Sequence, residues 1–322
     1  MSPTAGRFLA IGECMVEMAP AEGGLFRMGY AGDTFNTAWY ARRLLPPGWQ
    51  VGYATAVGDD AVSRAMLGFI EGEGIATDAI RALPGRTVGL YLIRLEDGER
   101  SFSYWRGQSA ARALADDPAW QEGTLSGRDV LFFSAITLAI LPPEGRERLV
   151  AALARARAAG AMVAFDTNLR PRLWRDGEEM RAGLTLGASA ASVVLPSFDE
   201  EAGLFGDASP EATVARYRDL GAEVIAVTDG PRPATVWSAR GIARHAPPRV
   251  GQPVDTTAAG DSFDAGLLAA LATGVPLGEA VERAMALAAR VVGCRGALAD
   301  DPAWLEGTLS GRDVLFFSAI TL

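Results

Sequence analysis

Residues 255–263 read DTTAAGDSF, a run of small residues that leads into a helix predicted over 261–272. Small side chains let a ligand approach the backbone closely, and the first turn of a helix offers N–H groups without an acceptor inside the helix. Asp261 lies in that turn, where the helix dipole favours a carboxylate. The segment therefore predicts an anion-binding cradle beside a general base, although a plain helix start explains the same residues. The amides of this cradle belong to Ala258, Ala259 and Gly260.

Residues 29–36 form a second glycine-containing segment, GYAGDTFN, before a helix predicted over 33–45. Gly32 would let a polar substrate reach the backbone, while Asp33 and Asn36 would offer a carboxylate and an amide to its hydroxyl groups. The segment lacks the third glycine of the GxGxxG pattern that marks dinucleotide-binding loops. A turn with Asp33 as the helix cap is the alternative interpretation.

Strand and helix alternate along most of the chain, which predicts an α/β fold with a mainly parallel central sheet and helices on both faces. Two segments, 87–95 and 99–104, depart from the alternation and resemble a hairpin. We therefore expect a small β lid, with strands within 14–32 and 86–106. The strands of the main sheet are predicted over 8–18, 51–57, 129–135, 161–165, 192–195 and 223–228, and the principal helices over 33–45, 61–71, 144–159, 261–272 and 277–292.

The composition of the 322 residues narrows the chemistry. All 30 basic residues are arginines, and 39 acidic residues give a net charge of −9. The absence of lysine excludes P-loop NTPases, protein kinases, pyridoxal enzymes and Schiff-base aldolases, and the negative charge disfavours nucleic acid or an anionic membrane as partner. One histidine, His245, and two cysteines, Cys14 and Cys294, exclude a His-rich zinc site and suggest no disulfide framework. Acid–base chemistry therefore falls to carboxylates.

The hydrophobic residues, 49% of the chain, are enough for a large core, but no apolar run is long enough to span a membrane. The chain opens without a basic segment followed by an apolar core. These features predict a cytoplasmic protein with no membrane partner.

A near-verbatim repeat stands out in the sequence. Residues 113–138 and 297–322 differ at one position, where Gln121 corresponds to Leu305. Two copies so far apart do not make a solenoid, in which adjacent repeats stack. We interpret 1–298 as one α/β domain with its lid, and 299–322, the repeat of 115–138, as a tail of non-native origin.

Polar residues follow several predicted strands, where α/β folds bind ligands. Arg106 follows the hairpin and Arg170 follows strand 161–165, and either arginine would hold a carboxylate through two hydrogen bonds. Solvated surface arginines are the alternative. Glu200 follows strand 192–195 and would place a carboxylate near a hydrated Mg²⁺. Thr228 ends strand 223–228 and would offer a hydroxyl to a phosphate.

Taken in order, these segments resemble the ribokinase/PfkB family of sugar kinases over roughly residues 8–297. DTTAAGDSFDAG is similar to the C-terminal signature of that family, and YAGDTFNTA to its N-terminal one. Within the family, the stretches IGECMVEM, GDTFNTA, SYWRGQSAA and DTNLRPRLW look most like the kinases of 2-keto-3-deoxygluconate.

The resemblance implies a ribokinase-like fold and transfer of a phosphoryl group from ATP, with Mg²⁺, to the 6-hydroxyl of 2-keto-3-deoxygluconate. Asp261 matches the general base, the 258–260 amides would hold the phosphoryl group, and Arg106 or Arg170 would hold the carboxylate of the sugar acid. Family lid strands often pair between subunits, which implies a homo-oligomer. The implied sugar-binding residues are Gly32, Asp33, Asn36, Tyr91, Tyr104, Arg106 and Arg170. The implied nucleotide-binding residues are Asn168, Ser197, Thr228, Gly230, Ala258 and Gly260, with Glu200 near the metal through water.

Three departures from the family pattern occur. Ala31 replaces the first glycine of a usual pair, Ser197 stands where relatives often have asparagine, and Thr228-Asp229 replaces a turn that often contains lysine. Two alternatives stay open: a kinase of a neutral sugar such as fructose or ribose, and a catalytically silent sugar-binding protein. The sequence does not separate the gluconate from the galactonate epimer.

Overall fold

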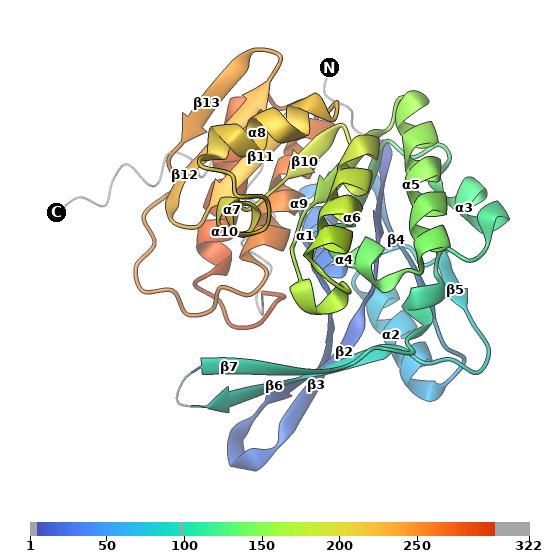
Figure 1. Cartoon of the computed structure of the whole chain (residues 1–322). Coiled ribbons are helices and arrows are strands. Elements are labelled where there is room, and N and C mark those ends of the chain that lie inside the picture. Colours follow the sequence, from blue (N-terminus) through green and yellow to red (C-terminus); the bar gives the residue numbers. More distant parts are fainter. Residues whose placement is uncertain (1–4, 97–98, 300–322) are drawn as a thin grey trace.

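The structure is a computed structural model that describes residues 5–96 and 99–299. Within these residues the main sheet has nine strands in the order β13-β12-β11-β10-β9-β8-β1-β4-β5 (Figure 1). Neighbours from β11 to β5 run parallel, and the β11–β12 and β12–β13 pairs are antiparallel. The predicted mainly parallel sheet is confirmed. Its strands are β1 Ala5–Ile11, β4 Gly48–Val57, β5 Ile80–Ala82, β8 Val130–Ser134, β9 Met162–Asp166, β10 Val193–Leu195, β11 Val224–Asp229, β12 Arg232–Ser238 and β13 Gly241–His245.

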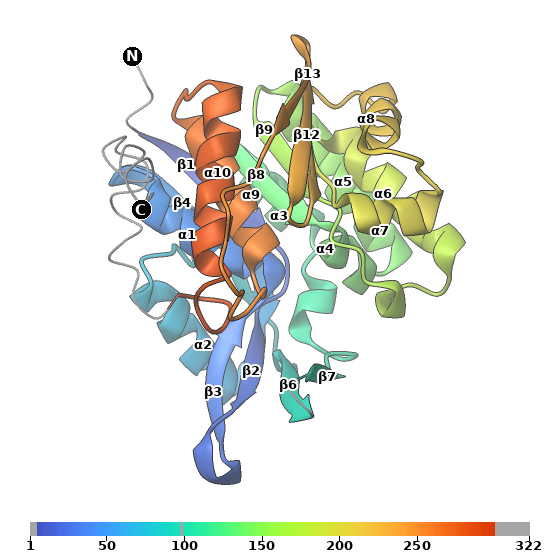
Figure 2. The same ribbon diagram turned by 90° about the vertical axis from the view of Figure 1, so that its left-hand side faces the viewer.

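Helices cover both faces of the main sheet (Figure 2). Alternation along β1 divides the core: Phe8 and Ala10 belong to the hydrophobic cluster on one face, while Leu9 and Ile11 belong to the cluster on the other. The first face is covered by α1 Asp33–Leu44, α2 Ala61–Gly72, α9 Ala259–Ala272 and α10 Leu277–Val291. The second is covered by α3 Pro118–Leu125, α4 Ala135–Ile140, α5 Pro143–Ala158, α6 Gly177–Ala190, α7 Phe198–Phe205 and α8 Pro210–Asp219.

A separate four-stranded sheet in the order β3-β2-β6-β7 extends away from the main sheet (Figure 1). These strands lie within the ranges predicted for the lid, 14–32 and 86–106. The lid strands are β2 Met15–Pro20, β3 Phe26–Ala31, β6 Gly89–Glu96 and β7 Glu99–Trp105.

The prediction of one strand over 8–18 is wrong, because the chain leaves the main sheet inside this range. β1 and β2 belong to different sheets and are joined by Gly12, Glu13 and Cys14. The Gly12 N–H still donates to the Ala54 carbonyl (3.1 Å), and a Cβ at Gly12 would lie 2.3 Å from Thr34 Oγ1. Apolar residues flank Gly12 and Glu13 on both sides, because both strands are buried there, and this pattern predicted a single strand.

Among residues 5–96 and 99–299, no helix combines the length and the apolarity that a membrane span requires. The first copy of the repeat contributes α3, β8 and α4. Ala297 and Ala299, which begin the second copy, are buried in the core. The proposed tail lies outside the described residues from position 300 onward.

Candidate active site

The segment 255–263 forms the loop before α9 and its first turn, as predicted. Asp255 is buried and anchors this loop: its carboxylate accepts hydrogen bonds from the Thr257 N–H (3.0 Å), the Thr257 hydroxyl (2.7 Å) and the Gly296 N–H (2.8 Å). Three donors on one carboxylate fix where α9 begins.

Ala258, the residue before α9, has φ 59°, in the left-handed region that alanine rarely adopts. It is the one non-glycine residue with positive φ in the described part of the chain. Such conformations concentrate at functional sites, where the surrounding structure maintains them. A Cβ at Gly260 would meet no atom within 4 Å, so a ligand has room beside this backbone. Of the three predicted cradle amides, that of Ala259 already donates to the Thr256 carbonyl, at 3.3 Å.

The side chain of Asp261 meets the second predicted segment. Asn36 Nδ2 on α1 donates to Asp261 Oδ2 (2.7 Å), and the Thr37 hydroxyl donates to the Asp261 carbonyl (3.2 Å). Burial, followed by the charge of Asp33, raises the pKa of Asp261 to about 7, while Asn36 and Arg170 act in the opposite direction. A carboxylate with a pKa near neutrality is suited to remove a proton from an alcohol during the reaction.

Gly32 has no room for a side chain, because a Cβ there would lie 2.1 Å from the Glu13 carbonyl oxygen. Asp33 follows as the first residue of α1, and no side chain caps this helix. The prediction of Asp33 as a cap is therefore wrong. Its Oδ2 instead accepts hydrogen bonds from the Ser134 hydroxyl and from Asn168 Nδ2 (3.3 Å), which reach it from the neighbouring strand ends. Asn168, predicted beside the nucleotide, thus contacts Asp33 of the sugar segment.

Two further aspartates, the partly buried Asp166 and the buried Asp264, interact electrostatically with Asp261, and sequence reasoning missed both. Burial raises the pKa of Asp166 well above its usual value, and the charges of Asp33 and Asp261 add to the effect. Burial also raises the pKa of Asp264, together with the charges of Asp166 and Asp261. Asp264 lies one helical turn after Asp261, a spacing that could have signalled a shared face.

The lid contributes aromatic side chains and one predicted arginine. Tyr91 on β6 and Tyr104 on β7 lie directly opposite each other, with ring centroids 5.9 Å apart, and the Tyr91 hydroxyl donates to the Glu17 carboxylate. Arg106 follows β7 and forms an ion pair with Glu13. The guanidinium predicted to bind a substrate carboxylate therefore already has an acidic partner.

Arg170 lies after β9, and its side chain is 49% exposed. Its Nη1 contacts the Leu169 carbonyl (2.6 Å) and Glu200 Oε1 (3.3 Å), and its charge lowers the pKa of Asp261. Glu200 Oε2 accepts the Leu169 N–H (3.0 Å), so the predicted metal-associated carboxylate also holds the 168–170 loop.

Three of the residues predicted along the nucleotide, Ser197, Thr228 and Gly230, lie at the ends of β10 and β11. Ser197 and Thr228 form a parallel bridge, and the Thr228 N–H donates to the Pro196 carbonyl (2.9 Å). Gly230 makes the following turn with φ 53°, which favours glycine. A cation that sequence reasoning missed lies here: Arg232 pairs with Asp229 of this turn and with the exposed Asp199 of α7.

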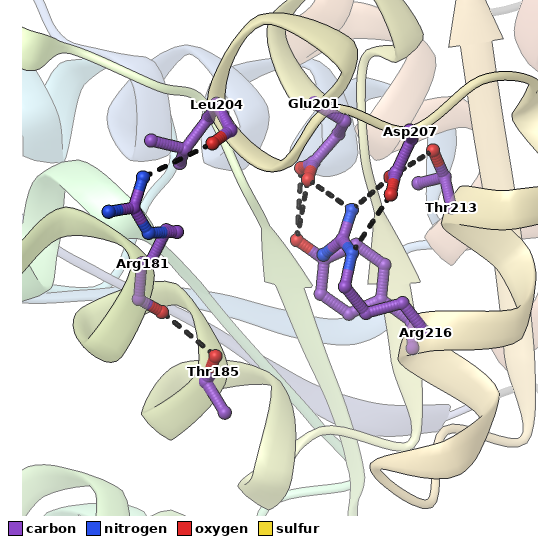
Figure 3. A network of polar contacts seen from close by, with 8 residues as sticks. Arg181, Thr185, Glu201, Leu204, Asp207, Thr213 and Arg216 are labelled. Carbon is purple, nitrogen blue, oxygen red and sulfur yellow. Dashed lines mark hydrogen bonds and ion pairs between the residues drawn. The ribbon is translucent and has the colours of Figure 1, made fainter. Parts of the chain in front are cut away.

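The helix that carries Glu200 is anchored by a polar network that includes Glu201, Arg216 and Asp207 (Figure 3). Glu201 is fully buried, accepts from the Tyr217 hydroxyl (2.9 Å) and pairs with Arg216 (2.8 Å). Arg216 also pairs with Asp207. Because a buried charge is costly unless paired, the network holds α7 against α8 and thereby fixes Ser197 and Glu200.

Within residues 5–96 and 99–299, no three His, Cys, Asp or Glu side chains are grouped as a ready metal site. Mg²⁺ in kinases commonly binds one or two carboxylates together with substrate phosphates. Glu200, 35% exposed beside the 168–170 loop, suits such an arrangement as an acceptor for metal-bound water.

Comparison with known proteins assigns the chain to a family. Residues 7–304 match the pfkB family of carbohydrate kinases. The chain belongs to this family. It is 37% identical over 300 residues to the 2-dehydro-3-deoxygluconokinase of Escherichia coli K12, covering 91% of this chain and 96% of that protein.

Two solved structures superpose over most of the chain. The PfkB protein from Polaromonas sp. JS666 has a TM-score of 0.81 and 30% identity, over 94% of this chain and 99% of that one. The fructokinase of Xylella fastidiosa with bound ATP has a TM-score of 0.80 and 26% identity, with the same coverage. The predicted family and ribokinase-like fold are confirmed, and the protein is a phosphotransferase that uses an alcohol as acceptor.

Proposed function

We propose that this protein is a 2-keto-3-deoxygluconate kinase, which transfers the terminal phosphoryl group of ATP to the 6-hydroxyl of the sugar acid. The proposal rests on the environment of Asp261. This residue lies in the first turn of α9, accepts a hydrogen bond from Asn36 of the sugar segment, and has a pKa of about 7. The similarity to the 2-dehydro-3-deoxygluconokinase of E. coli supports the substrate class.

In the proposed reaction Asp261 removes the proton from the 6-hydroxyl as its oxygen attacks the γ-phosphorus. The bond from that phosphorus to the bridging oxygen breaks, and ADP leaves with the electron pair. The N–H groups of Ala258 and Gly260 at the start of α9, which have no backbone acceptor among the described residues, would face the charge that develops on the transferring group. Bound Mg²⁺ would neutralise phosphate charge, with Glu200 accepting from its water.

Arg170 is the proposed partner of the substrate carboxylate. It is half-exposed and electrostatically coupled to Asp261, and its ion-pair partner Glu200 is itself partly exposed, whereas Arg106 is 10% exposed and paired with the buried Glu13. Gly32, Asp33 and Asn36 would contact the sugar hydroxyls. Tyr91 and Tyr104 of the lid would pack against the sugar. Neutral-sugar kinases do not need a cation at Arg170, which favours the sugar acid over fructose or ribose.

The nucleotide would lie along Ser197, Thr228 and Gly230, the residues that the β10 and β11 ends bring together. Asn168 is proposed to orient Asp33 rather than to bind the nucleotide, since its amide contacts that carboxylate.

A second copy of the chain is the proposed partner of the lid. Large apolar side chains remain exposed on the lid strands and their turns, which is typical of an interaction surface. They are Leu25, Phe26, Met28, Phe102 and Trp105. Light scattering of the purified protein should give the mass of an oligomer.

ADP release measured on a panel of sugars tests the function. We expect turnover with 2-keto-3-deoxygluconate and little with fructose or ribose. The galactonate epimer in the same panel determines how strictly the site reads the epimeric hydroxyl. Strong turnover with fructose and none with the sugar acid would overturn the substrate assignment, and no ADP release with any sugar would overturn the kinase.

A further inference from the structure

Glu13 lies in the three-residue link between β1 and β2, where the chain passes from the main sheet to the lid. Its side chain is 1% exposed, and it forms an ion pair with Arg106, which is 10% exposed and follows the last lid strand. Neither the sequence patterns nor the described chemistry of Asp261 accounts for a charged group at this buried position.

Two glycines leave the space that Glu13 occupies. A Cβ at Gly32 would lie 2.1 Å from the Glu13 carbonyl oxygen, and a Cβ at Gly89 would lie 2.8 Å from Glu13 Oε1. The same added Cβ at Gly89 would lie 3.2 Å from the Cβ of Arg106. Glu13 therefore contacts the sugar segment, the first residue of β6 and the arginine at the end of β7 together.

The electrostatics of the pair match this geometry. Burial raises the pKa of Glu13, the charge of Arg106 opposes the rise, and Asp33 of the sugar segment adds to it. A buried ion pair is weak evidence for stability, because well-packed apolar residues of similar volume stabilise a fold equally well. What the pair does provide is direction, since a carboxylate restricts a guanidinium to a few orientations.

We propose that Glu13 is a positioning residue for the sugar site: it holds the guanidinium of Arg106 in place and joins the lid to the sugar segment at Gly32. With its charge balanced by Glu13, Arg106 would act as an oriented hydrogen-bond donor to the sugar. Glu13 would influence the reaction only through Arg106 and the lid, without touching the substrate. The inference rests on the proposed function, because that function packs the sugar against Tyr104 of the lid, two residues before Arg106.

The test is a double-mutant cycle on KM for the sugar acid, with the variants E13Q, R106Q and E13Q/R106Q. We expect E13Q to raise this KM about tenfold, which corresponds to the loss of one charge-assisted hydrogen bond from Arg106 to the sugar. KM for ATP should stay within about twofold. If Glu13 acts through Arg106, the double variant has the KM of R106Q alone. Additive effects, or an unchanged KM in E13Q, would overturn the inference.

A purely structural role is separated from positioning by two controls. E22Q removes an exposed carboxylate of the lid and should leave both KM values unchanged. Thermal melting of each variant reports folding, because a general loss of stability lowers the melting temperature without a selective rise of one KM. If E13Q does not fold, E13D replaces it in the test. This variant keeps the negative charge but has a side chain one methylene shorter, which moves the carboxylate away from Arg106. The same selective rise is expected of E13D, and an unchanged KM overturns the inference.

The wild-type protein separates this inference from the function on which it rests. If the wild type phosphorylates 2-keto-3-deoxygluconate and the cycle shows no coupling, only the role of Glu13 fails. If the wild type phosphorylates another sugar instead, the proposed substrate fails, and the same cycle is run on that sugar.

Discussion

Asn36 Nδ2 and Asp261 Oδ2 are 2.7 Å apart, although the two residues are separated by 225 positions in the chain. The bond joins the first turns of α1 and α9, which pack side by side on one face of the sheet. A donor to a carboxylate favours its ionised form, so Asn36 opposes the rise in pKa that burial and Asp33 impose on Asp261. The pair thus orients the proposed base and tunes its proton affinity.

The pH dependence of kcat/KM should show this pKa. Asp261 must be ionised to accept a proton, and its pKa is about 7. We expect kcat/KM to rise with pH and to level off above about pH 7, because this parameter reports groups of the free enzyme. Initial rates from pH 5 to 9 at saturating ATP measure it. An acid limb near pH 4, the ordinary value for aspartate, would contradict the assignment.

Replacing Asn36 with alanine should move the same limb. Loss of the donor leaves burial and Asp33 unopposed, so the limb should shift upward by about one pH unit. Thr34→Val offers a matched control on α1, since the Thr34 hydroxyl forms a hydrogen bond with the Tyr53 hydroxyl and not with Asp261. A limb that shifts equally in both variants would assign the effect to α1 packing.

Replacing Asp261 with asparagine should reduce kcat by about 10²-fold or more, as the loss of a general base predicts, while the sugar still binds. The same change should stabilise the fold at high pH. The folded protein keeps the proton of Asp261 up to about pH 7, whereas the unfolded chain loses it near pH 4, so wild-type stability falls as pH rises through this window.

Denaturant unfolding at two pH values checks this linkage. The advantage of the Asp261→Asn variant should be larger at pH 8 than at pH 5, by about 1–3 kcal/mol. An advantage of equal size at both pH values would show that Asp261 does not titrate in this range.

Replacing Arg170 with leucine should raise KM for the sugar acid by about 10–100-fold and change KM for ATP little, since charge-assisted hydrogen bonds to a carboxylate are the contacts removed. Arg172→Leu is the control: Arg172 lies in the same loop. Equal effects on both substrates would assign Arg170 to the general charge of the cleft.

Removal of residues 300–322 should leave kcat within about twofold of that of the full chain. The melting temperature should stay within about 4 °C. A chain that ends at Cys294 is the contrasting variant. It loses the Gly296 N–H that binds Asp255 and the Ala297 carbonyl that accepts from the Tyr40 hydroxyl (3.0 Å). We expect it to melt lower and to lose activity, because the loop before α9 loses an anchor. A large loss on removal of 300–322 would show that the repeated tail is part of the fold.

Short-range patterns in the amino-acid sequence determined much of this protein. The period of apolar residues predicted the α/β layers, and the small residues at 258–260 with Asp261 predicted the cradle and its base. The sugar segment was predicted as one group because its residues lie within a single short stretch of sequence. They are Gly32, Asp33 and Asn36.

Tertiary structure alone decided which of these groups meet. Apolar residues on both sides of Gly12 and Glu13 predicted one strand over 8–18, so neither the passage from sheet to lid nor the pairing of Glu13 with Arg106 was predicted. Asp33 was expected to cap its own helix, but it binds Ser134 and Asn168, which lie more than 100 positions away in the sequence at the ends of two neighbouring strands. Such pairings depend on how strands are ordered across the sheet. The role of a charged side chain also depends on the partner beside which it is buried. Local sequence patterns encode neither the strand order nor these partners.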